Sequence, residues 1–241
     1  MMLLQRGVNL IDQGDDVRLD DPKVAETLAF YAQLVAGPRR VTGVTQPGNA
    51  ALPRDVAEGN LCAFITPDWR VTYIKRYGGA ATSGRMRMMP LPVFDPTDTP
   101  TSTHGGTMIG ITRASDKPDL AWQLIEFLYF SDAGIAARRR HSEILPPIRR
   151  MWDDPYYHQP DPFFGGQKGN ELLTELAGQI PPRYATPATS IATTALNDAL
   201  VRAVDYVERN GPAGLEAACQ TWLTASARKL EARMKQWRFD E

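Results

Sequence analysis

The chain has 241 residues, of which 43% are hydrophobic and 23% are charged, as in an ordinary globular protein. Its formal net charge of −1 creates no strong field toward nucleic acid, so we expect no nucleic-acid partner. Cys62, Cys219 and the three histidines show no metal-ligand or disulfide spacing. We therefore expect no metal site and two buried free thiols.

The sequence contains no stretch that approaches the ~20 apolar residues needed to span a bilayer. The first residues, MMLLQRGVNLIDQ, lack the basic region, the long apolar core and the cleavage site of a secretory signal peptide. From the residues alone we expect neither a membrane span nor a signal peptide.

The first half of the chain carries one complete helix pattern and three apolar runs. Asp21 can cap a helix, Pro22 suits its first position, and Gly37 followed by proline can end it. A short helical turn is expected at 54–58. The runs at 61–66 and 85–93 are predicted to be buried strands, and the run at 104–112 is predicted to be a strand that begins with glycines.

The second half is mainly helical by pattern. A helix is predicted at 115–130 with four residues facing inward, Ala121, Leu124, Ile125 and Leu128. A short helix follows, and its basic end at 137–141 is interpreted as a solvated helix end rather than a phosphate site. Residues 144–167 are predicted to be an ordered loop packed by its rings. Helices at 169–180, 188–211 and 212–237 complete a helix-rich α/β fold, the last two as an antiparallel pair.

The sequence lacks the motifs of common enzyme classes. The nucleophile elbow, the Walker loop, the dinucleotide fingerprint and the H-E-x-x-H zinc motif are all missing. Asp153 and Asp154 are adjacent carboxylates, but neighbours in a loop diverge, and a capping or solvated role is the better interpretation. We therefore predict a protein that is not an enzyme and uses no cofactor.

Aromatic and polar residues instead gather at predicted strand ends and helix starts. Trp69 follows the run at 61–66, His104 precedes another run, and Tyr184 precedes the helix at 188–211. Aromatic faces accept the apolar C–H surface of a sugar, and fixed polar groups satisfy its hydroxyls. For Trp69, half-buried core packing is an equally good interpretation from the residues alone.

The order of three motifs is similar to that of a known family. EGNLCAFITPDWRVTYIKRY is followed by MRMMPLPVFDPTDTPTSTHGGTMIGITRASDKPDLAWQLIEFLYFSDAG and then by ILPPI. This order resembles the extracellular solute-binding proteins of bacterial ABC sugar importers (family 1, the maltose-binding-protein-like group). The resemblance implies a type II periplasmic-binding-protein fold with two lobes. Residues 1–103 and 151–241 would build most of the C-terminal lobe, and residues 104–150 would cross over to complete the N-terminal lobe.

The resemblance also implies a ligand site in a cleft between the lobes. Trp69 would stack on sugar, while Asp68 and Arg70 would hydrogen-bond hydroxyls or, equally, form a surface ion pair. Further cleft residues are implied near the hinge and before the helix at 188–211, namely His104, Gly105, Gly106, Arg183 and Tyr184.

The function implied is non-catalytic capture of a sugar or oligosaccharide, with lobe closure and delivery to the transmembrane subunits of an ABC permease. Such proteins work in the periplasm or at the cell surface. Family members carry a signal peptide and most of one lobe before the part that matches Met1. We therefore expect a truncated member with impaired binding that self-associates through the face left open. The alternatives are a carbohydrate-active hydrolase using Asp153 or Asp154, and a cytosolic interaction module derived from the lobe.

Overall fold

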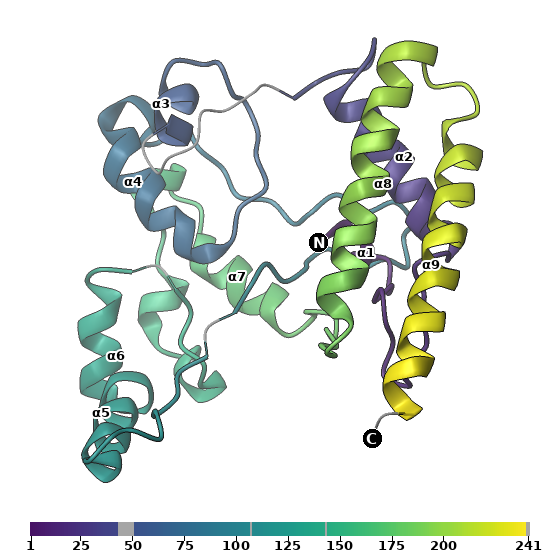
Figure 1. Cartoon of the computed structure of the whole chain (residues 1–241). Helices are drawn as coiled ribbons and strands as arrows, with labels where there is room; N and C mark the ends of the chain where they lie inside the picture. Colours follow the sequence, from purple (N-terminus) through teal and green to yellow (C-terminus); the bar gives the residue numbers. More distant parts are fainter. Residues whose placement is uncertain (43–50, 107, 143, 240–241) are drawn as a thin grey trace. The chain divides into compact units, whose positions relative to one another are not determined.

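The computed structural model describes residues 1–42, 51–106, 108–142 and 144–239, with side chains described as far as residue 236. The chain forms two compact units (Figure 1). Unit 1 comprises Met1–Val44, Val93–Ser102 and Pro181–Glu241, and unit 2 comprises Thr45–Pro92 and Thr103–Ile180. Among the helices so described, none is long and apolar enough to cross a membrane. The sequence prediction, with boundaries at residues 103 and 150, concerns the two lobes of a solute-binding protein rather than these units, and it stays a prediction.

Unit 1 is built from helices α1 (Met2–Gln5), α2 (Pro22–Val35), α8 (Thr189–Asn210) and α9 (Leu215–Phe239). Helices α2, α8 and α9 contact one another pairwise (Figure 1), which confirms the predicted pairing of the last two helices. Alanines are frequent in their shared core, and they let the helix axes approach closely. The core contains Ala25, Ala29, Ala32, Ala199, Ala203 and Ala227 together with the larger Leu19, Val24, Leu28, Val207, Leu215 and Leu223.

The ends of α2 follow the predicted chemistry. Asp21 accepts a hydrogen bond from the backbone N–H of Lys23 at 2.9 Å, and Pro22 takes the first helical position. Beyond the helix, Gly37 has a φ of +72°, and a Cβ there would lie 2.6 Å from Cγ1 of Val207. Glycine is required at this position both by the left-handed backbone and by the approach of α8.

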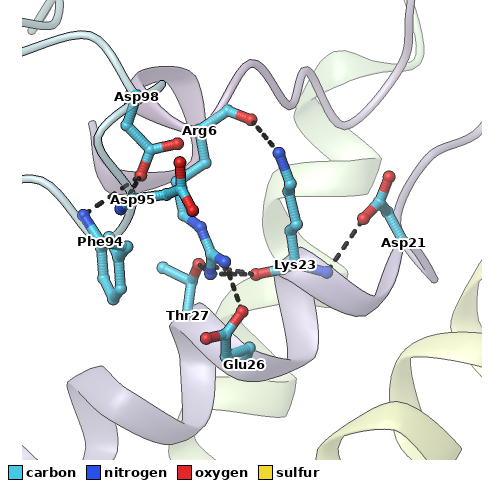
Figure 2. Close-up of polar contacts among 8 residues, drawn as sticks. All are labelled: Arg6, Asp21, Lys23, Glu26, Thr27, Phe94, Asp95 and Asp98. Atoms are coloured by element: carbon cyan, nitrogen blue, oxygen red, sulfur yellow. Dashed lines mark hydrogen bonds and ion pairs between the residues drawn. The ribbon is translucent and has the colours of Figure 1, made fainter.

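A buried arginine joins α2 to the segment at 93–102 (Figure 2). Nη1 of Arg6 donates to Oγ1 of Thr27 at 2.8 Å and to the carbonyl of Lys23 at 3.2 Å, and Nη2 pairs with Glu26. The guanidinium carbon lies 4.6 Å from the ring centroid of Phe94. The Arg6 side chain is 7% exposed, whereas that of Glu26 is 49% exposed. This cluster therefore places a buried positive charge against a half-solvated partner.

Hydrogen bonds that involve the backbone hold the same segment in place. The backbone N–H of Thr99 donates to the carbonyl of Gln5 at 3.0 Å, and Nε2 of Gln5 donates to the carbonyl of Thr99 at 3.1 Å. Oδ2 of Asp98 accepts from the N–H groups of Phe94 and the following residue, which closes a tight turn (Figure 2). The segment thus belongs to unit 1 although its neighbours in sequence belong to unit 2.

Unit 2 contains five helices and three 3-10 turns in its described part. The elements are α3 (Ala51–Ala57), α4 (Asp68–Thr82), α5 (Pro118–Phe130), α6 (Asp132–Arg139), η1 (Arg149–Met151), η2 (Pro155–His158), η3 (Pro162–Phe164) and α7 (Gly169–Ala177). Val71 and Ile74 of α4 pack with Phe163 and Phe164 of η3 in a small core. Because Tyr157 is also buried, the prediction of an ordered, ring-packed loop at 144–167 is confirmed.

The predicted strands at 61–66, 85–93 and 104–112 are wrong for the residues that the structure describes. The described pairing between extended segments is limited to two isolated bridges, Ile11 with Val17 and Asp161 with Gln167. A strand needs a hydrogen-bonded neighbour, and apolar runs form buried strands only when a sheet covers them. Met108 is instead 98% exposed. The helix-rich character is confirmed, and the type II fold stays a prediction.

Helix α5 buries less than its pattern predicts. Of the four residues expected to face inward only Ile125 is buried, and Leu124 is 56% exposed. The cause is one-sided packing, since α5 lies mainly against the short helix α6. The helix consequently presents further exposed apolar side chains, Leu120, Trp122, Phe127 and Phe130.

The two thiols differ in environment, which corrects the expectation that both are buried. Cys62 is exposed, whereas Cys219 is buried and burial raises the pKa of its thiol to about 11. At pH 8 we expect a thiol-specific disulfide reagent to modify one cysteine of the native chain and two after denaturation, because the thiolate is the reactive form. Cys62→Ser should remove the native reaction, and rapid modification of both thiols in native buffer would contradict the structure.

Candidate functional site

Trp69 lies at the start of a helix rather than after a strand. It is the second residue of α4, preceded by Pro67 in an extended conformation and by Asp68. Oδ1 of Asp68 accepts from the N–H of Trp69 at 2.8 Å, and Oδ2 accepts from the N–H of Leu145 at 3.2 Å. Asp68 therefore fixes the beginning of the helix against the ring-packed loop. A carboxylate is also favoured by the dipole in this first turn.

Three aromatic residues of α4, Trp69, Tyr73 and Tyr77, are spaced four residues apart and so share one face of the helix. We call them the aromatic row. The ring centroids of Trp69 and Tyr73 lie 6.1 Å apart edge-on, and those of Tyr73 and Tyr77 lie 6.3 Å apart with planes 11° from parallel. Trp69 is half-buried, and Tyr77 is 49% exposed. Tyr73 is half-buried as well, so the row is partly accessible and most exposed at Tyr77.

Arg70 adds a cation to one end of the aromatic row. Its guanidinium carbon lies 5.1 Å from the centroid of the Trp69 ring, within the range of a cation–π contact. Asp68 and Arg70 therefore have separate roles in the described contacts, since the acid holds backbone N–H groups and the base covers the indole.

The predicted glycine pair lies in an open loop of unit 2. His104, Gly105 and Gly106 are exposed, and a Cβ built on either glycine meets nothing within 4 Å. Gly105 has a φ of +86°, which explains a glycine there on backbone grounds alone. Whether these residues line a ligand site stays a prediction.

Arg183 and Tyr184 belong to unit 1, whereas the other candidates belong to unit 2. Asn9 holds their segment from two sides, since Oδ1 accepts from the N–H of Tyr184 and Nδ2 donates to the carbonyl of Pro182, each at 3.1 Å. Arg183 is exposed and Tyr184 is half-buried. The segment is therefore held in place just before α8, and a role in ligand contact stays a prediction.

Unit 2 also contains a pocket of about 390 Å³ between the end of α6 and η2. Nη1 of Arg139 donates to Oδ2 of Asp154 at 2.6 Å, and Oδ1 of Asp154 accepts from the N–H of Tyr156 at 2.9 Å. Both hydrogen bonds hold the pKa of Asp154 below its ordinary value, and the bond from Tyr156 has the larger effect. The capping role predicted for Asp154 is confirmed. The full lining is Ala136, Arg139, Arg140, Asp154, Pro155, Tyr156 and Gln159.

The basic run at 137–141 is only partly a solvated helix end. The guanidinium carbon of Arg138 lies 4.6 Å from the Tyr129 ring, and that of Arg139 lies 5.0 Å from the Tyr156 ring. Both side chains are half-buried, whereas Arg140 is exposed.

Within the described residues, no group of three His, Cys, Asp or Glu side chains could hold a metal ion.

Comparison with known proteins places this geometry in context. No family model matches the chain. Over 213 residues, the chain is 26% identical to the arabinooligosaccharide-binding protein of Halalkalibacterium halodurans. The aligned region covers 83% of this chain and 46% of that protein. The chain is distantly related to a sugar-binding protein. It spans less than half the length of this curated relative, which is named for binding rather than for catalysis.

The sequence interpretation found one end of the aromatic row and missed the rest. Tyr73 and Tyr77 follow Trp69 at helical spacing, a signal that the expectation of a strand and a loop concealed. The pairing of Arg139 with Asp154 joins residues 15 positions apart, and no local pattern indicates it.

Proposed function

We propose that this chain is the ligand-capturing part of an ABC sugar importer's solute-binding protein. It binds an oligosaccharide without chemistry and presents it to the transmembrane permease subunits. The observation that carries the proposal is the 26% identity to an arabinooligosaccharide-binding protein over 83% of the chain. A periplasmic or cell-surface location and the two-lobed type II fold belong to the same proposal.

The aromatic row is the proposed contact surface for the sugar. Rings eight residues apart on a helix span about 12 Å along its axis, at 1.5 Å per residue, which suits several sugar units better than one. Indole and phenol faces would cover the C–H surfaces, while Arg70 and the tyrosine hydroxyls would bond to sugar hydroxyls. We propose His104, Gly105, Gly106, Arg183 and Tyr184 as further contacts. The reduced affinity expected from the resemblance stays a prediction.

Saturation-transfer NMR tests this proposal, because it detects binding in the millimolar range. We expect saturable magnetisation transfer to linear arabino-oligosaccharides, tested as a series from the disaccharide to the tetrasaccharide. Trp69→Ala should weaken binding about tenfold to a hundredfold, because an indole face buries roughly 1.5–3 kcal/mol of apolar contact. Trp122→Ala is the matched control, since this indole is exposed on α5 outside the aromatic row. Unchanged binding by Trp69→Ala would refute the proposed site, and absent transfer with every oligosaccharide would refute the function.

The hydrolase alternative is disfavoured by the state of Asp154. Both of its oxygens accept hydrogen bonds, and its pKa lies below the ordinary value. A glycosidase acid needs a raised pKa in order to hold its proton. Asp153 beside it is exposed, so it does not lie in the enclosed site that a glycosidase acid occupies.

A second candidate function is an interaction module, and α5 is the observation that favours it. Leu120, Trp122, Leu124, Phe127 and Phe130 are each 47% exposed or more. Exposed apolar side chains gathered on one helix commonly mark a protein contact. Self-association through these side chains is compatible with sugar binding by α4, so both proposals can hold together.

A further inference from the structure

The pocket between α6 and η2 contains charged groups for which the proposed function has no use. On one wall, Arg139 is neutralised by Asp154 at 2.6 Å. The second carboxylate oxygen of Asp154 accepts a hydrogen bond from the N–H of Tyr156 at 2.9 Å. The acid is thus engaged twice in hydrogen bonding, and it is held in place by its own turn.

Arg140 lines the same pocket, and none of the described lining residues compensates its charge. Its side chain is exposed, and the described part of the chain provides it with no hydrogen bond or ion pair. Since Arg139 and Asp154 cancel, the lining has a net charge of about +1. A guanidinium offers two parallel N–H donors, a geometry that matches a carboxylate.

The remaining lining suits a small ring. Tyr156 contributes an aromatic ring, Pro155 and Ala136 contribute apolar surface, and Gln159 contributes an amide that can both donate and accept. The volume of about 390 Å³ lies within the range of roughly 300–1,000 Å³ typical of small-molecule sites. Cations at a helix C-terminus are explained by the dipole, but the dipole alone explains neither the hollow nor its apolar wall.

We propose that this pocket binds a small ring-bearing carboxylate of the sugar-acid class. The carboxylate would bond to Arg140, the ring would lie against Tyr156 and Pro155, and Gln159 would bond to a hydroxyl. The site is separate from the aromatic row, so it can exist whether or not α4 binds an oligosaccharide.

Titration of the ¹⁵N-labelled full chain tests the proposal with two matched sugars. D-glucuronate and D-glucose share a ring and differ in the carboxylate that Arg140 would bind. We expect saturable amide shifts for glucuronate at 136–140 and 154–159, with glucose at least tenfold weaker. Inorganic phosphate should also be weaker, because it cannot use the apolar wall. Equal affinity for glucose or for phosphate would overturn the proposal, and so would the absence of saturable shifts with glucuronate.

Substitution of the exposed arginine provides the second arm. Arg140→Gln should weaken glucuronate binding about tenfold or more, because a charge-assisted pair is lost. The affinity of Arg140→Lys should fall between those of the original chain and Arg140→Gln, since lysine retains the charge but lacks the two parallel N–H donors of a guanidinium. Arg113→Gln is the matched control, because Arg113 is an exposed arginine of unit 2 outside the lining. Unchanged affinity in Arg140→Gln, with an intact amide spectrum, would overturn the proposal.

Discussion

Leu223→Ala is expected to lower the free energy of unfolding by about 2–5 kcal/mol, the usual cost of a large-to-small change in a tight core. Leu223 is fully buried on α9, among the residues that α2 and α8 contribute to the unit 1 core. The core cluster that contains it consists mostly of alanines and other short apolar side chains, which cannot extend to fill the space. Since small domains are stable by only about 5–15 kcal/mol, this loss is a large fraction of the total.

Chemical denaturation followed by circular dichroism measures the effect of the Leu223 substitution. Val201→Ala is the matched control, because Val201 lies on α8 and is 70% exposed. It should change the free energy by less than about 0.5 kcal/mol, as surface substitutions usually do. A cost below about 1 kcal/mol for Leu223→Ala would mean that the three-helix core is not packed as described.

Glu26→Ala is expected to destabilise unit 1 more than Arg6→Met does, although Arg6 is the buried partner. Removal of Glu26 leaves the Arg6 guanidinium with neutral hydrogen-bond partners, the oxygens of Thr27 and Lys23, and with Asp95 as a longer-range negative charge. A buried charge that loses its paired carboxylate costs several kcal/mol, whereas replacing the charge with an apolar side chain of similar size is often near neutral. Because Glu26 is 49% exposed, we discount its loss to about 1–3 kcal/mol.

The order of the two variants is the test, measured by denaturation in the same buffer. Methionine preserves the apolar stem against Phe94, and the freed carboxylate of Glu26 becomes solvated. If Arg6→Met proved the more damaging change, the hydrogen bonds of Arg6 would outweigh the cost of burying its charge. That outcome would contradict the electrostatic account of the cluster in Figure 2.

Helices could be predicted from the sequence where their signals are local. Asp21, Pro22 and Gly37 mark the two ends of α2 within one segment, and the structure places them as predicted. The apolar spacing of α9 likewise predicts its buried face, including Leu223 and Leu230. Capping and periodicity act within a few turns, so one sequence contains all of the information.

Strands could not be predicted in this way, because they depend on distant partners. Apolar runs such as 61–66 have the composition of a buried strand, yet the described residues provide no neighbouring strand. The same error concealed α4, whose start at Pro67 and Asp68 was assigned to the end of a strand. Sugar stacking and half-buried core packing were equal predictions for Trp69, and Tyr73 and Tyr77 became visible beside it only once the helix was known.

The indole N–H signal of Trp69 gives the most direct test of the central claim, that α4 presents an aromatic surface to an oligosaccharide. The signal can be assigned with Trp69→Phe and followed while an arabino-oligosaccharide is titrated into the ¹⁵N-labelled chain. The account predicts a shift that saturates with ligand, while the indole signal of Trp122 stays in place. A Trp69 signal that stays in place throughout the titration would contradict the claim, whether or not the signals of other residues shift.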